Sequence, residues 1–377
     1  MKKVTIYVIL ASMLLAWPAP AFAKAPGDSA EASIVIHADT GRVLCSKNAD
    51  ARKLIASTTK IMTALVVLNN CDPDETVEIK PEHSAIEGSS TYLKPDGEYT
   101  VRDLLYGMLL ASGNDAAAAL ACHCAGDIAA FAQMMNDTAA QLGLENSSFE
   151  NPHGLDGEYH YSSAYDLAMI AREALKNELF AEIVSSKTHT IGEQTYVNHN
   201  TLLWNYEGCI GVKTGYTMAA GRTLVSCAER DGMRLICVTL SDRDDWNDHM
   251  ALYDWAFSEY ENRSLLPMGE ISRIPVISGE QDSIGVRAAE NSRVFCEKGR
   301  EIELRLELPR FVYAGIREGE PAGIARVYSG DELLGEYELV YSETVGVAQG
   351  IRMTPWEKFL RVWYMANKFG FVLGGEA

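Results

Sequence analysis

The sequence predicts an α/β domain, with an antiparallel sheet flanked by helices, followed by a small all-β domain. Strand-like stretches near the N-terminus (32–36 and 43–45) and again over 188–239 enclose a long helical region. After Pro267, short alternating strands continue to about residue 351 without a long helix. Strands on both sides of the helical region are expected to pair in one sheet made from distant parts of the chain.

Each element has a local signal. Apolar residues at helical spacing, with Ser162 or Ser163 as the cap of one helix, predict helices over residues 58–68, 101–110, 115–125, 127–142, 163–175 and 244–260. The polar stretch 72–100 contains glycines and prolines, and is expected to be irregular or to form short strands. Alternating apolar residues predict a strand over 208–216 and a hairpin that pairs 222–229 with 233–240 around Asp231-Gly232.

The N-terminus has the pattern of a signal peptide. Lys2 and Lys3 precede an apolar run over 4–17, and Ala21-Phe22-Ala23 is a small-x-small cleavage site. The run is short for a membrane span, and a retained anchor is the alternative. The chain is therefore expected to be exported and to work at the outer face of the cytoplasmic membrane or in the cell wall. The expected divisions are a signal peptide (1–23), the α/β domain (24–266), the β domain (267–352) and a C-terminal helix (355–377).

The last predicted helix is amphipathic. Its aromatic and apolar residues recur on one face: Trp356, Phe359, Leu360, Trp363 and Tyr364. Two tryptophans on that face favour a helix that lies in a membrane interface, because the stretch is too short and too charged to span. The alternative is a helix packed on its own β domain.

The composition bears on partners and cofactors. A formal charge of −19 argues against nucleic-acid binding, so an anionic substrate must be held by a few local cations. The spacing of the eight cysteines does not suggest a disulfide framework, and buried free thiols are favoured over disulfides. Cys122-His123-Cys124 lacks the second ligand pair of common zinc sites, so neither a metal nor another cofactor is expected.

Three short motifs carry the candidate chemistry. In chain order they are an S-x-x-K at a helix start, an S-x-N in a turn between helices and a K-T-G on a strand, namely Ser57-Thr58-Thr59-Lys60, Ser112-Gly113-Asn114 and Lys213-Thr214-Gly215. Each motif alone arises by chance in many chains of this length. Together, in this order and in these structural contexts, they indicate a serine acyl-transfer site.

The first motif supplies a nucleophile and a base. A serine is a poor nucleophile until a base removes its proton, and residues i and i+3 of a helix share a face, so Lys60 can reach the Ser57 hydroxyl. A lysine acts as a base only when it is neutral. Burial and a second cation, for which Lys213 is the candidate, lower the pKa of an amine. Asn114 is expected to hold Lys60 in place.

The other motifs serve the acyl group and the leaving group. The backbone N–H of Ser57, at a helix N-terminus, is a candidate oxyanion donor. Gly215 allows the strand to approach closely, so that the N–H of Tyr216 is the second candidate donor. Ser112 is the candidate to relay a proton between Lys60 and the leaving amine.

With these motifs and the residues around them, the chain resembles the low-molecular-mass penicillin-binding proteins, specifically the serine D-alanyl-D-alanine carboxypeptidases. The resemblance is dense over roughly residues 30–265 and includes the stretches 56–63, 104–110, 151–155 and 211–217. It implies a penicillin-recognising, β-lactamase-like serine transpeptidase fold and an acyl-enzyme on Ser57. It also implies peptidoglycan stem peptides as substrates, release of the terminal D-alanine of pentapeptides, and β-lactam antibiotics as acylating inhibitors.

The chain departs from the family pattern at two positions. Gly113 stands where the family often has alanine, and His199 stands between two asparagines where related carboxypeptidases have arginine. That arginine is thought to help hold the substrate carboxylate, so Lys213, Thr214 and Arg222 are candidates to compensate. The expected substrate-binding residues are therefore Thr214, Gly215, Tyr216, His199 and Arg222.

Other functions were weighed against this one. A β-lactamase of class A would need a glutamate in an E-x-x-x-N loop. Glu173 and Asn177 match, but fall in an apolar-periodic helical stretch over 166–179. A DD-endopeptidase with the same serine would differ only in pocket shape, whereas intact motifs argue against a wall-binding protein with a dead site. His153 and His160 are expected to cap helices or to face solvent, and the alternative is that they support the residues of the site from behind.

Overall fold

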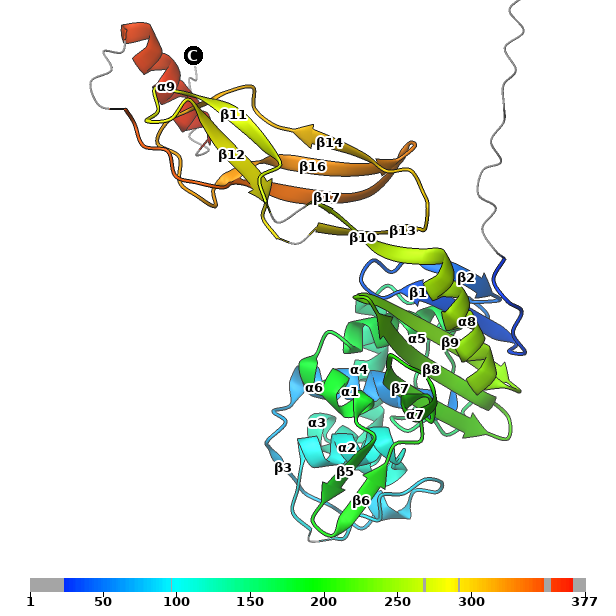
Figure 1. Ribbon diagram of the computed structural model, residues 1–377. Helices are drawn as coiled ribbons and strands as arrows, with labels where there is room; N and C mark the ends of the chain where they lie inside the picture. Colours follow the sequence, from blue (N-terminus) through cyan, green and yellow to red (C-terminus); the bar gives the residue numbers. More distant parts are fainter. Residues whose placement is uncertain (1–23, 96, 267–268, 291, 349–353, 369–377) are drawn as a thin grey trace, which may run out of the picture.

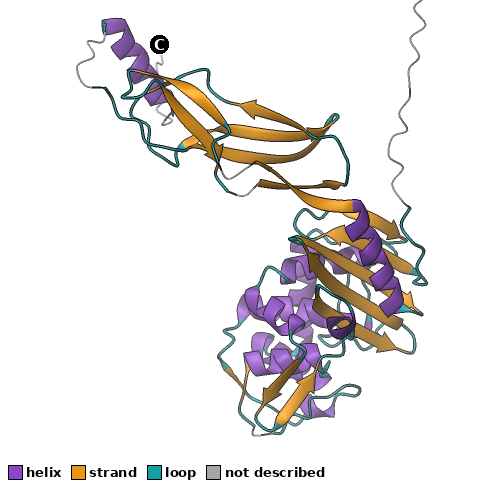
Figure 2. Cartoon of the chain, viewed as in Figure 1, coloured by secondary structure: helices purple, strands orange, loops and turns teal. Residues whose placement is uncertain are grey.

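The computed structural model describes residues 24–95, 97–266, 269–290, 292–348 and 354–368. The predicted signal peptide, residues 1–23, lies outside the described residues. Up to residue 266 the chain forms helices around a five-stranded sheet, and after it the chain is mostly β (Figures 1 and 2). The predicted α/β domain followed by a β region is therefore what the structure shows.

Distant parts of the chain form the first sheet, as predicted. Its strand order is β2-β1-β9-β8-β7, and every neighbouring pair is antiparallel. The strands are β1 (Ala32–His37), β2 (Val43–Lys47), β7 (Cys209–Thr217), β8 (Gly221–Arg230) and β9 (Met233–Asp242). Since β1 pairs with β9, the N-terminal strands lie in the same sheet as the β8–β9 hairpin, which follows the helical region.

Helices cover both faces of this sheet (Figure 1). One face packs on α8 (Asp245–Glu259), and the other on a larger helical group. That group contains α1 (Lys60–Asn70), α2 (Val101–Leu110), α3 (Asn114–Ala125), α4 (Ile128–Gln141), α5 (Ala164–Ala174) and α6 (Glu178–Ser185). The helix α7 (Leu202–Asn205) is a single turn within the predicted β region.

The β8–β9 hairpin has the predicted register. Cys227 pairs with Ile236, so Cys227 and Cys237 point to opposite faces of the sheet and belong to different cores. All eight cysteines are free. The expectation that they are buried holds for Cys227, Cys237 and Cys296 and is wrong for the other five, which are only half-buried.

The helical stretch expected over 166–179 is broken. The helix α5 ends at Ala174, and α6 begins at Glu178. Asn177 is the N-cap of α6, because its side-chain oxygen accepts a hydrogen bond from the N–H of Phe180 at 3.1 Å. An asparagine that caps a helix competes with continuation of the preceding one, which apolar spacing alone does not reveal.

The second region is built on a six-stranded sheet of order β14-β16-β17-β12-β11-β15. Its strands are β11 (Ser272–Ile277), β12 (Ser283–Ala288), β14 (Glu303–Glu307), β15 (Val312–Tyr313), β16 (Pro321–Ser329) and β17 (Glu332–Tyr341). Before it, β10 (Tyr260–Leu266) pairs with β13 (Ser292–Glu297). The domain boundary predicted after residue 266 therefore falls at the end of β10, and β10 pairs with β13 on the far side of that boundary.

Other elements lie outside these two sheets. The pair β3 (Thr76–Val77) and β4 (Tyr99–Thr100) lies in the stretch expected to be irregular, together with the 3₁₀ turn His83–Ala85. The hairpin of β5 (Thr188–Ile191) and β6 (Gln194–Val197) precedes α7. The amphipathic helix α9 covers Pro355–Lys368.

Candidate active site

Ser57 lies on a 3₁₀ turn that leads directly into α1. The turn covers Ala56–Thr59, so α1 begins at Lys60 rather than at Thr58 as predicted. Two threonine hydroxyls fasten the turn: Thr58 donates to the Ile55 carbonyl at 2.6 Å, and Thr59 donates to the Ala56 carbonyl at 2.8 Å. These bonds replace the regular first turn of a helix and hold the serine in a fixed position.

Lys60 is completely buried beside Ser57. Its Nζ lies 2.9 Å from Ser57 Oγ, 2.7 Å from Asn114 Oδ1 and 2.6 Å from the His153 carbonyl oxygen. Asn114 is itself held, because its Nδ2 donates to the Glu87 carbonyl at 2.7 Å. Burial, followed by the charge of Lys213, lowers the pKa of Lys60 well below its usual value.

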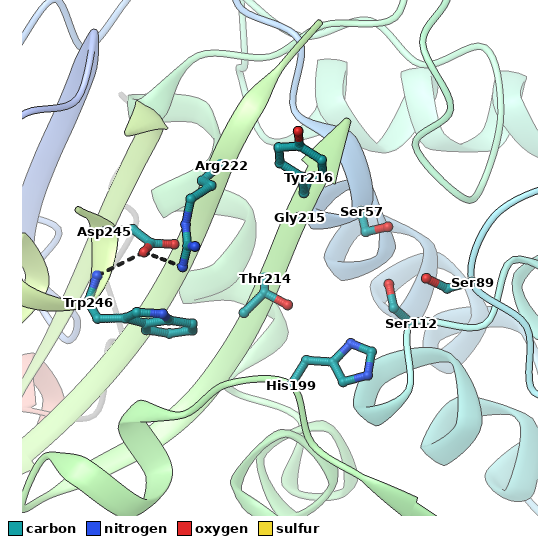
Figure 3. Close-up of a pocket in the computed structure, with 10 residues that line it drawn as sticks. All are labelled: Ser57, Ser89, Ser112, His199, Thr214, Gly215, Tyr216, Arg222, Asp245 and Trp246. Carbon is teal, nitrogen blue, oxygen red and sulfur yellow. Dashed lines mark hydrogen bonds and ion pairs between the residues drawn. The ribbon is translucent and has the colours of Figure 1, made fainter. Parts of the chain in front are cut away.

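The second and third motifs lie next to this pair. Ser112 is in the turn between α2 and α3 with a positive φ of 63°, and its side chain faces the same pocket as Ser57 (Figure 3). Lys213 is buried on β7, and its Nζ donates to the Thr214 carbonyl at 3.0 Å. Burial lowers the pKa of Lys213 to about 7. All three motifs thus come together as the sequence predicts, although their catalytic roles remain predictions.

Gly215 is required by close packing of β7 against the serine turn. A Cβ added there would lie 2.9 Å from the backbone nitrogen of Ser57 and 2.4 Å from Thr223 Oγ1. The Thr223 hydroxyl donates to the Ile55 carbonyl at 3.1 Å, which ties β8 to the same turn. Any larger residue at 215 would push the strand away from Ser57.

These residues open into a pocket of about 470 Å³. It is lined by Ser57, Ser89, Ser112, His199, Thr214, Gly215, Tyr216, Arg222, Asp245 and Trp246. Figure 3 shows the three serines on one side of Thr214 and Arg222, Asp245 and Trp246 on the other. The five predicted substrate-binding residues all line this pocket.

The pocket has one fixed cation among its ten lining residues. Arg222 Nη2 lies 2.7 Å from Asp245 Oδ1, and the guanidinium lies 5.7 Å from the centre of the Trp246 ring. Burial lowers the pKa of His199, as do the charges of Lys213 and Lys60, so His199 is mostly neutral at neutral pH. His199 therefore does not replace the charge of an arginine at its position.

The prediction that His153 and His160 cap helices or face solvent is wrong. Both are buried, at 7% and 1% exposed. The His153 carbonyl accepts a hydrogen bond from Lys60, and His160 Nε2 lies 2.8 Å from Thr59 Oγ1. Burial and the charge of Lys60 lower the pKa of His153 to about 3 and that of His160 to about 4. Both rings are thus mostly neutral at neutral pH, and the His160 ring contacts the serine turn through Thr59.

Three lining residues were missed by sequence reasoning. Ser89 lies in the irregular stretch before β4, while Asp245 and Trp246 begin α8. None of them belongs to a short motif, and only the three-dimensional packing brings them to the pocket. Among the described residues, no group of three or more His, Cys, Asp or Glu side chains is placed to hold a metal ion.

The E-x-x-x-N match of the β-lactamase alternative is not at the pocket. Glu173 pairs with Lys176 at 2.6 Å on the surface of α5, and Asn177 caps α6. Neither residue lines the pocket that contains Ser57. The structure therefore offers no deacylating glutamate at these positions.

Comparison with known proteins identifies the family. The sequence profile described as D-alanyl-D-alanine carboxypeptidase (peptidase S11) matches residues 20–244, more than half of the chain. The chain belongs to the D-alanyl-D-alanine carboxypeptidase family. A second profile, described as the C-terminal domain of penicillin-binding protein 5, matches residues 260–347 of this carboxypeptidase.

Individual relatives agree with this assignment. The D-alanyl-D-alanine carboxypeptidase DacF of Bacillus subtilis is 33% identical over 95% of this chain and 100% of its own length. Penicillin-binding protein 5 of Haemophilus influenzae has a crystal structure that superposes with a TM-score of 0.68 at 30% identity, covering 86% of this chain and 99% of that one. The Streptomyces K15 DD-transpeptidase is 35% identical with a TM-score of 0.60, covering 62% of this chain and 99% of its own.

The predicted penicillin-recognising fold and DD-carboxypeptidase activity are thereby confirmed. This carboxypeptidase is a hydrolase of a family that acts on peptidoglycan peptides and binds β-lactams as penicillin-binding proteins.

The lowered pKa of Lys60 predicts how acylation depends on pH. A protonated Lys60 cannot accept the Ser57 proton, so the rate constant for acylation by a fluorescent penicillin is expected to rise with pH as the amine becomes neutral, and to level off well below the usual lysine pKa. Stopped-flow labelling from about pH 5 to about pH 9 measures this profile. A rate that rises only near the pKa of a free lysine would contradict a neutral Lys60 as the base.

Proposed function

We propose that this carboxypeptidase is exported and removes the terminal D-alanine of peptidoglycan pentapeptides through an acyl-enzyme on Ser57. The observation that carries the proposal is the 2.9 Å contact between Lys60 Nζ and Ser57 Oγ inside a buried network. A lysine that is desolvated, and therefore easily deprotonated, is a suitable base for a serine hydroxyl.

Acylation follows from this geometry. Neutral Lys60 takes the Ser57 proton while Oγ attacks the carbonyl carbon of the penultimate D-alanine. The backbone N–H groups of Ser57 and Tyr216 are the proposed donors to the oxyanion. Lys60 then returns the proton through Ser112 to the leaving nitrogen, and free D-alanine departs. Water hydrolyses the ester by the reverse proton path and restores the serine.

The substrate carboxylate is proposed to bind Thr214 and Arg222. Arg222 carries the fixed positive charge of the pocket, and its side chain is 44% exposed. Asp245 engages Nη2 of the guanidinium, which leaves other N–H donors for the substrate. The hydroxyl of Thr214 lies on β7 between Arg222 and the serines (Figure 3). Arg222 would thus supply the cation that His199 lacks.

Substitution of the nucleophile tests the acyl-enzyme. Ser57→Ala is expected to abolish both labelling by a fluorescent penicillin and D-alanine release from pentapeptide, because the other two oxygens on Lys60, from the Asn114 amide and the His153 carbonyl, are not nucleophiles. Ser185→Ala, an exposed serine on α6, is the matched control and should behave as wild type. Gel fluorescence and a D-alanine assay measure the two activities. Full labelling of Ser57→Ala would contradict the assignment of Ser57 as the nucleophile.

The role of Arg222 has a separate test. Arg222→Leu is expected to lower kcat/KM for pentapeptide about 10- to 100-fold, the range for loss of a charged hydrogen bond, while Arg222→Lys retains more activity. For a pentapeptide whose terminal carboxylate is converted to an amide, Arg222→Leu and the wild type are expected to have the same kcat/KM. Equal losses on the acid and the amide would show that Arg222 does not bind the carboxylate.

Export and membrane attachment rest on the two ends of the chain. The sequence pattern over 1–23 supports secretion, as does a family that acts on peptidoglycan. On α9, Trp356, Phe359 and Trp363 are 66%, 54% and 54% exposed, which favours an interfacial helix over one packed on the β domain. Within the described ranges, no single helix is long and apolar enough to cross a bilayer, although the bent pair α3–α4 passes that test as a unit.

The membrane proposal is tested on α9 itself. Trp356→Ala with Trp363→Ala is expected to reduce co-sedimentation with phosphatidylglycerol–phosphatidylethanolamine vesicles at least about fivefold, because the two rings supply much of its apolar face. Phe311→Ala removes an exposed aromatic side chain of the β region and serves as the control. Undiminished sedimentation of the double variant would favour a helix that does not contact lipid.

A further inference from the structure

The helices α1 and α3 pack against each other and meet at their active-site ends. There Lys60, the first residue of α1, contacts Asn114, the first residue of α3, at 2.7 Å. Cys71, the C-cap of α1, lies eleven residues after Lys60, and Cys124, in the last turn of α3, lies ten residues after Asn114. At the helical rise per residue, both cysteines lie about 15 Å from the active-site ends of their helices. Each helix therefore carries one thiol at its far end.

The two thiols meet at this far end. Cys71 and Cys124 share a side-chain hydrogen bond, and both pack on the main core of the α/β domain. Glu75 and His123, which lie four residues after Cys71 and directly before Cys124, join the same ends by a 2.9 Å contact. Both thiols are free and half-buried in this structure. Two sulfurs within hydrogen-bonding reach need little movement to come to the bond length of a disulfide.

A third cysteine nearby has a different environment. Cys122 is on the same helix as Cys124 and is also half-buried, but residues i and i+2 of a helix point apart. Cys71 and Cys124 share Glu75 as a charged neighbour, whereas Cys122 lies near Lys80. Cys122 is therefore a thiol of similar burial that does not face Cys71, and it provides a matched control for the pair.

The hydrogen bond between the thiols makes them unequal. Burial raises the pKa of both thiols, that of Cys71 to about 12. The hydrogen bond with Cys71 acts in the opposite direction on Cys124 and lowers its pKa, so Cys124 is the more easily ionised of the two. A thiolate is the species that attacks a disulfide, and Cys124 is therefore expected to react first with a disulfide oxidant.

We propose that Cys71 and Cys124 form a disulfide in the exported protein, which staples together the far ends of the two helices that carry Lys60 and Asn114. The inference goes beyond the proposed function and takes from it only export, because exported proteins meet disulfide oxidants whereas cytosolic proteins are kept reduced. The Cys124 thiolate attacks one sulfur of a small disulfide, such as oxidised glutathione, and displaces one thiol. The Cys71 sulfur then attacks the mixed disulfide, displaces the second thiol and forms the Sγ–Sγ bond. The protein loses two protons and two electrons, and the small disulfide is reduced to two thiols.

The staple stabilises the catalytic domain from a place outside the pocket. It closes the stretch from Cys71 to Cys124, which contains the irregular segment before β4, the helix α2 and the turn of Ser112. Closing a long loop reduces the conformational entropy of the unfolded chain and so raises the free energy of unfolding. In the folded chain it holds α3 along α1, and so supports the contact of Asn114 with Lys60 from the opposite ends of both helices.

The experiment compares the reduced and the oxidised full-length protein. Reduced protein has eight thiols, and equilibration with oxidised and reduced glutathione is expected to join two of them. Mass spectrometry of a non-reduced digest should then show the peptide that contains Cys71 linked to the peptide that contains Cys124. The melting temperature of the oxidised protein should be higher by about 5 to 10 °C, the size expected for closure of a loop of this length.

Matched variants assign the effect to this pair. Cys71→Ser and Cys124→Ser should each give no linked peptide and no rise in melting temperature on oxidation. Cys122→Ser removes the neighbouring thiol of α3 and should keep both effects. None of the three residues lines the pocket of Ser57, so fluorescent-penicillin labelling at the wild-type rate verifies that each reduced variant is folded.

Each outcome decides the proposal independently of the acyl-enzyme. A wild type that keeps all eight thiols in the oxidising buffer overturns the disulfide, as does a digest in which Cys71 or Cys124 is linked to another cysteine instead. An oxidised protein that melts no higher than the reduced one overturns the role of the bond as a staple. Ser57→Ala should show the same linked peptide and the same rise in melting temperature, so a failure of the proposed function at Ser57 leaves this test intact.

Discussion

The buried amine of Lys60 is the constraint on which this site depends. A buried nitrogen with no solvent contact must find its hydrogen-bond partners within the protein, and here three oxygen atoms from Ser57, Asn114 and His153 surround it. These acceptors come from the serine turn, from the start of α3 and from the loop before α5. The Lys60 amine therefore fixes these three segments relative to one another. The hydroxyl of Ser57, the proposed nucleophile, is one of its hydrogen-bond partners.

The serine turn is also the place where the sheet meets the helices. The strand β7 passes so close to the serine turn that only Gly215 fits, and β8 is tied to that turn by Thr223. Because β1 pairs with β9, the first strands of the chain join the sheet whose edge strand β7 lies against the serine turn. The active site thus lies where the sheet meets the helices, and both contribute residues to it.

Sequence reasoning located the parts of the site that short motifs encode. Ser57, Lys60, Ser112, Asn114 and Lys213 come together because each sits in a local context that residue spacing reveals. Asp245 and Trp246 could not be found in this way, since they reach the pocket only through packing of α8. The contact of His153 with Lys60 was missed for a related reason. It is made by the main-chain carbonyl, which every residue has, so the residue type gives no signal for it.

The pairing of Arg222 with Asp245 has a consequence for turnover. A guanidinium that already faces a carboxylate at 2.7 Å presents a reduced net charge to any second anion. In the proposed binding mode a peptide would also lie along β7, whereas released D-alanine would have only its own carboxylate and amine to hold it. If Arg222 binds the carboxylate as proposed, the half-neutralised cation would retain the small product weakly, which would favour its release.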